Sequence, residues 1–175
     1  MVAQSKTGWV EGSHPAAVDD TATYVEGIRA GVVGATTIAL WFLVVDLVAG
    51  RPFYTPAVLG HAVFNGPAGL AGGAAIEPSL ELVLGFTWIH GLVFLLLGLL
   101  ASRLLALADR DPNYGFGILL LFVVFEVGFV FVCMLAAEPI LQALTVPAII
   151  IGNLLAAIAM ALVFRRHRGA LTALP

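Results

Sequence analysis

ELVLGFTWIHGLVFLLLGLLASRLLA, residues 81–106, is apolar over almost its whole length. At ~1.5 Å per residue a helix over this stretch crosses the ~30 Å hydrocarbon core of a bilayer. Three further runs, at 28–49, 115–137 and 139–164, have the same character. The sequence therefore predicts an all-α fold, an integral membrane four-helix bundle.

The composition of the 175-residue chain agrees with a membrane protein. Hydrophobic residues make up 61% and charged residues 11%, whereas an ordinary soluble domain has about 25% charged residues. We expect one membrane domain over 24–168, between a polar tail at 1–23 and a short tail at 169–175. The net charge of −3 argues against a nucleic-acid partner.

Basic residues predict the orientation of the chain. Four spans place the N-terminal tail, the 107–114 turn and the C-terminus on one side of the membrane. That side carries Lys6, Arg29, Arg103, Arg110, Arg165, Arg166 and Arg168, and the other side carries only Arg51. Because basic residues concentrate on the cytoplasmic side, we expect both termini in the cytoplasm and the chain in the cell membrane. The 1–23 tail has no apolar segment and is not expected to be a signal peptide.

The connection 50–80 is the longest between two spans, and we expect a short helix in it. Thr55-Pro56 is typical of an N-cap followed by the first turn of a helix. The expected helix covers 56–65, lies at the outer membrane surface and carries His61.

Small residues recur at helical spacing in three of the runs. They are Ala30, Gly31, Gly34 and Ala35 in the first, Gly91, Gly98 and Ser102 in the second, and Ala148, Gly152 and Ala156 in the fourth. Such stripes let helix backbones approach closely in a membrane. We expect these faces to pack against neighbouring helices.

The polar residues inside the apolar runs include Asp46, His90, Glu126 and Asn153. Polar groups in the hydrocarbon are costly and usually face the bundle interior. From the outer helix ends, His90, Glu126 and Asn153 lie roughly 14, 16 and 21 Å deep, so the three are expected near one level. Asp46 lies closer to the outer boundary. We expect these four residues to form a buried polar network.

No catalytic or phosphate-binding motif is present, and the chain is expected to be a non-catalytic accessory or scaffold subunit. Its expected partners are membrane lipids together with other membrane subunits or copies of itself. The phrases TPAVLG (55–60) and TWIHG (87–91) resemble segments of four-span bacterial membrane proteins. That resemblance implies a bacterial membrane protein and adds no activity.

Two other functions are consistent with the same polar residues. In the first, the chain binds a metal or haem, with His90 as ligand, Glu126 as ligand or supporting partner, and His61 as a further ligand from outside. In the second, the chain is a small proton-coupled transporter that uses Asp46, His90 and Glu126.

Overall fold

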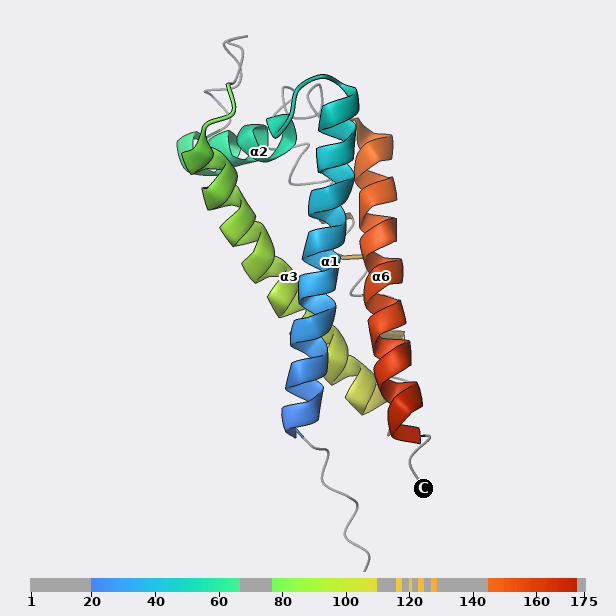
Figure 1. Cartoon of the computed structure of the whole chain (residues 1–175). Coiled ribbons are helices and arrows are strands. Elements are labelled where there is room, and N and C mark those ends of the chain that lie inside the picture. The colour runs from blue at the N-terminus through green and yellow to red at the C-terminus, as the bar shows by residue number, and fades with distance from the viewer. Residues whose placement is uncertain are drawn as a thin grey trace, which may run out of the picture.

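The structure described here is a computed structural model, and it describes residues 20–66, 77–109 and 145–172 with 116, 117, 120, 123, 124, 127 and 128 (Figure 1). This part consists of helices and the short turns or irregular residues that flank them. The helices there are α1 (Asp20–Val48), α2 (Tyr54–Asn65), α3 (Leu80–Ala108) and α6 (Val146–Thr172). Among them α1, α3 and α6 are long and apolar enough to cross a membrane. The prediction of an all-α chain with helices long and apolar enough to span a membrane is confirmed at this level.

The predicted four-helix bundle is not confirmed, because the described residues contain three candidate spans. The predicted span 115–137 lies largely outside them, and the seven of its residues that are described are helical. The predicted span 81–106 corresponds to α3. The helix α1 begins at Asp20, well before the predicted start at 28. The prediction started too late because it followed the apolar run, and the first turns of α1 carry polar residues.

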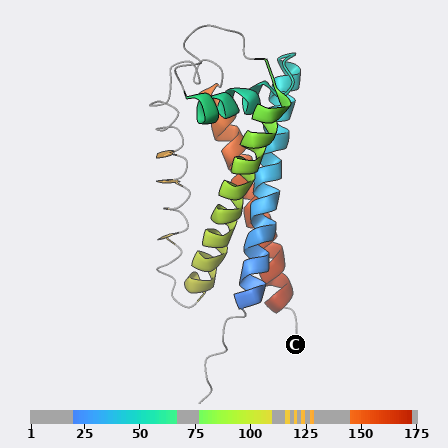
Figure 2. The ribbon, with the colours of Figure 1, turned by 90° about the vertical axis from the view of Figure 1, so that its left-hand side faces the viewer.

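The ends of the three long helices lie together in the way that the predicted order of spans requires (Figures 1 and 2). The start of α1 and the ends of α3 and α6 lie at one end of the molecule, so α1 runs antiparallel to both. The short helix α2 lies across the other end, next to the start of α3. Arg103 and Arg165 therefore lie at the first end, and Arg51, which follows α1, lies at the second.

Glycines bring α1 and α3 into backbone contact. A Cβ atom built on Gly98 would lie 2.2 Å from the carbonyl oxygen of Gly27 and 2.6 Å from the amide nitrogen of Gly31. No real Cβ tolerates such distances, so the crossing requires glycine. Gly91, predicted to share this stripe, differs: a Cβ there would meet nothing within 4 Å among the described residues.

The contact between α1 and α6 combines packing with one polar bond. Gly152 lies against the indole of Trp41, and a Cβ on it would lie 2.8 Å from Trp41 Cδ1. The same indole donates from Nε1 to the carbonyl oxygen of Ala148 at 2.8 Å. Ala156 is buried next to them, in a cluster with Ile38 and Phe94. The small residues predicted in this run therefore face α1.

Candidate functional site

The end of α1 holds the start of α2 through one carboxylate. Asp46 Oδ2 accepts the backbone N–H of Thr55 at 2.8 Å, and Oδ1 accepts the Thr55 hydroxyl at 2.7 Å. Both residues are buried, with 4% of Asp46 and 3% of Thr55 exposed. A carboxylate at this place also meets the positive end of the α2 dipole. Asp46 thus caps α2 from a different helix.

The short helix predicted over 56–65 is present as α2, but the prediction that Thr55 is its N-cap is wrong. The helix begins at Tyr54, and its N-cap is Phe53, whose backbone is left-handed with φ 62° and whose side chain caps nothing. Thr55 lies within the first turn and donates its hydroxyl proton to Asp46. The left-handed turn at Phe53 brings the α2 start back onto α1, which makes the local cap unnecessary.

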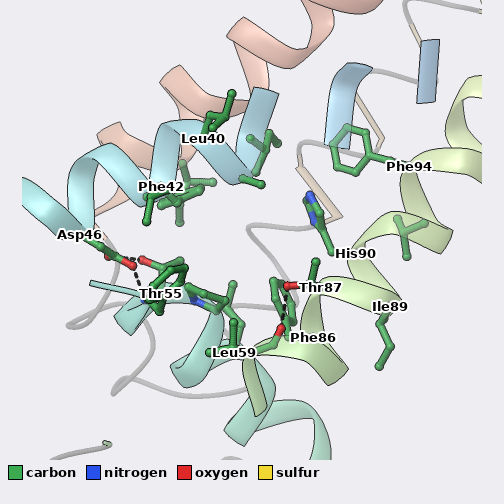
Figure 3. A pocket seen from close by; sticks show the side chains of 18 of the residues that line it. Leu40, Phe42, Asp46, Thr55, Leu59, Phe86, Thr87, Ile89, His90 and Phe94 are labelled. Carbon is green, nitrogen blue, oxygen red and sulfur yellow. Dashed lines mark hydrogen bonds between the residues drawn. The ribbon is translucent and has the colours of Figure 1, made fainter. Parts of the chain in front are cut away.

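A cavity of about 450 Å³ lies between α1, α2, α3 and α6 (Figure 3). Ligand pockets in proteins are typically ~300–1,000 Å³, mostly apolar, with a few polar groups. The lining matches that description. It consists of Ile38, Ala39, Leu40, Phe42, Leu43, Asp46, Phe53, Thr55, Pro56, Leu59, Val83, Phe86, Thr87, Ile89, His90, Val93, Phe94, Ile149 and Asn153.

His90 is fixed in this wall by three contacts. Its Nε2 lies 3.3 Å from the carbonyl oxygen of Ala35 on α1. Its ring is stacked on Phe86, with centroids 5.8 Å apart, and tilted against Phe94 at 4.8 Å. Thr87, one turn away on the same helix, donates its hydroxyl proton to Val83 O at 2.6 Å. Figure 3 shows the Asp46–Thr55 pair across the apolar lining from these α3 residues.

The cavity brings together three of the residues that the sequence singled out: Asp46, His90 and Asn153. Glu126 lies outside the described residues. His61 lies on α2 but does not line the cavity, and its Nδ1 is buried without a hydrogen-bond partner within the described part. The described residues hold no group of three His, Cys, Asp or Glu side chains that could bind a metal.

A second polar cluster, which the sequence analysis missed, joins α1, α3 and α6 near the opposite end. Ser102 Oγ lies 2.7 Å from Thr23 O and 2.9 Å from Glu26 Oε2, and His167 Nδ1 lies 3.9 Å from Glu26 Oε1. Ser102 is fully buried and Glu26 is 3% exposed. Ser102 was recognised only as a small residue, and Glu26 precedes the apolar run. The helical spacing of Thr23, Glu26 and Gly27 places them on one face of a helix, and this pattern could have indicated that the face packs against a neighbouring helix.

Replacing Ser102 with alanine is expected to lower the free energy of unfolding by about 1 kcal/mol, because both contacts of its hydroxyl join α3 to α1. Equilibrium unfolding in mixed micelles measures this. Thr36→Ala is the matched control, since the Thr36 hydroxyl bonds to Val32 O in its own helix. Equal losses in the two variants would contradict an inter-helix role for Ser102.

Comparisons of the chain with protein-family models, with curated proteins and with solved structures give no match.

Proposed function

We propose that the chain is a non-catalytic membrane protein that binds a small, mostly apolar molecule in the cavity between α1, α2, α3 and α6. The cavity itself is the observation that carries this proposal. Its volume and its apolar lining with a few polar groups are those of a ligand site. Its position beside three membrane-compatible helices suits a ligand that partitions into the bilayer.

The polar groups of the cavity support binding in preference to a reaction. Both carboxylate oxygens of Asp46 hold Thr55, and Nε2 of His90 faces the Ala35 carbonyl. Groups held in this way give a site a fixed shape and a fixed hydrogen-bonding pattern. A catalytic pair would instead need a nucleophile within hydrogen-bond reach of its base, and in the described part of the chain the hydrogen bond of His90 is to a backbone carbonyl.

In this proposal the protein acts as an accessory subunit next to other membrane subunits or copies of itself. The excess of basic residues at one end supports a cytoplasmic location for both termini. The cavity then lies in the outer half of the membrane domain, beneath α2.

The binding proposal is tested with 4-octylanisole, an apolar probe without a hydrogen-bond donor, on protein in lipid nanodiscs. Native mass spectrometry is expected to show one bound probe per chain, with saturation at micromolar concentration. Val93→Trp places a large side chain at the cavity wall and is expected to weaken binding at least tenfold.

Val44→Trp is the matched control, because Val44 is 53% exposed on α1 and is not among the cavity-lining residues. It should bind the probe like the wild type. Absence of saturable binding to the wild type, or an equal loss in both variants, would refute the proposed function.

A further inference from the structure

We infer that the cavity selects a lipophilic phenol or alcohol, whose hydroxyl group donates a hydrogen bond to Nδ1 of His90. This inference rests on the proposed binding function and specifies the chemical class of the ligand.

The bond between His90 and Ala35 fixes the tautomer of the imidazole. A backbone carbonyl oxygen can only accept a hydrogen bond, so Nε2 must carry the proton that Ala35 O receives at 3.3 Å. A neutral imidazole protonated at Nε2 has a lone pair on Nδ1. An unpaired charge in an apolar wall is costly, so His90 presents an acceptor.

Nδ1 of His90 is available to a ligand. Within the described part of the chain, the contact with Ala35 O is the hydrogen bond that His90 makes. The unpartnered nitrogens that are fully buried there belong to His61 and His167. Nδ1 of His90 is not one of these buried nitrogens, and it belongs to a residue that lines the cavity. A ligand donor at this place satisfies an acceptor that the apolar surroundings leave unpaired.

The side chains of Thr87 and Asp46, which also line the cavity, likewise present hydrogen-bond acceptors. The Thr87 hydroxyl uses its proton on Val83 O, which leaves its lone pairs for a ligand. The carboxylate of Asp46 accepts both of its bonds from Thr55. At His90, Thr87 and Asp46 a carboxylate or phosphate ligand would meet acceptors. A neutral hydroxyl supplies the missing donor without bringing a charge into an apolar cavity.

Aromatic side chains favour an aromatic ring next to that hydroxyl. Phe86 and Phe94 contact the two sides of His90, and Phe42 and Phe53 also line the cavity. Aromatic rings pack against one another in stacked or edge-to-face arrangements. A phenol combines such a ring with a hydrogen-bond donor.

The test compares 4-octylphenol with 4-octylanisole, its methyl ether, on the same nanodisc-embedded full-length protein. The wild type is expected to bind the phenol about tenfold more tightly. His90→Phe keeps a ring between Phe86 and Phe94 and removes the acceptor, so its affinities for the two probes should become equal while the anisole still binds. His90→Gln, which keeps an acceptor, should retain part of the preference and serves if His90→Phe fails to fold.

Equal affinity of the wild type for the two probes, or a phenol preference that persists in His90→Phe, would overturn the inference and leave cavity binding intact. Failure of both probes to bind would refute the proposed function and the inference together.

Discussion

Gly98→Ala is expected to lower the free energy of unfolding by about 3 kcal/mol or more, the upper range for overpacking a tightly packed contact. The added methyl group would overlap the carbonyl oxygen of Gly27 and the amide nitrogen of Gly31. Both are backbone atoms, so no change of rotamer can relieve the overlap and α1 must move away from α3. Thermal unfolding and size-exclusion profiles of the detergent-solubilised protein measure the effect.

Gly91→Ala is the matched control on the same helix. A Cβ at Gly91 meets nothing within 4 Å in the described part of the chain, and alanine is the better helix former by about 1 kcal/mol. This variant should be as stable as the wild type or slightly more so. A Gly98→Ala protein with wild-type stability would show that α1 and α3 do not cross as described.

Asp46→Ala is expected to be nearly as harmful, with a loss of about 3 kcal/mol. It removes the cap of α2 and leaves the N–H and hydroxyl of Thr55 buried without their acceptor, each a cost of roughly 1–3 kcal/mol unless water enters. Because α2 forms one wall of the cavity through Thr55, Pro56 and Leu59, binding of 4-octylanisole should fall as well. Hydrogen exchange of the α2 amides, followed by mass spectrometry, reports the loosening directly.

Thr55→Val provides the control for this cap. It removes the hydroxyl donor and keeps the backbone N–H that Asp46 also binds, so its loss should be smaller. The double variant Asp46→Ala/Thr55→Val should lose less than the sum of the single losses, because the two side chains share one bond. Strict additivity would contradict the described cap.

The spans follow from the sequence because a bilayer sets a minimum length that few other structures need. The run 81–106 is recognisable for that reason, and it differs from α3 by only one or two residues at each end. The start of α1 was less predictable. Its first turns carry polar residues, and the partner of the Thr23 carbonyl and the Glu26 carboxylate is Ser102, far away in the sequence.

The candidate site was predictable in its residue types and less so in its contacts. Asp46 and His90 stand out because polar groups are rare in apolar runs. The donor set of Asp46 depends on the left-handed turn at Phe53, a conformation that sequence patterns do not predict for phenylalanine. The cavity also needs α2 folded back across the bundle, which no periodicity indicates.

Asp46 and Glu26, two buried acidic residues of α1, meet their hydrogen-bond partners at different times during synthesis of the chain. Asp46 bonds to Thr55, nine residues later, whereas the contact of Glu26 is with Ser102, 76 residues later. At ~5–20 residues per second, the chain reaches Thr55 roughly half a second to two seconds after Asp46, and Ser102 roughly 4–15 seconds after Glu26. The helix α1 is synthesised before α3 and α6 and packs against both, so its surroundings stay incomplete until α6 has been made. Until then, the lipid and the insertion machinery must accommodate it.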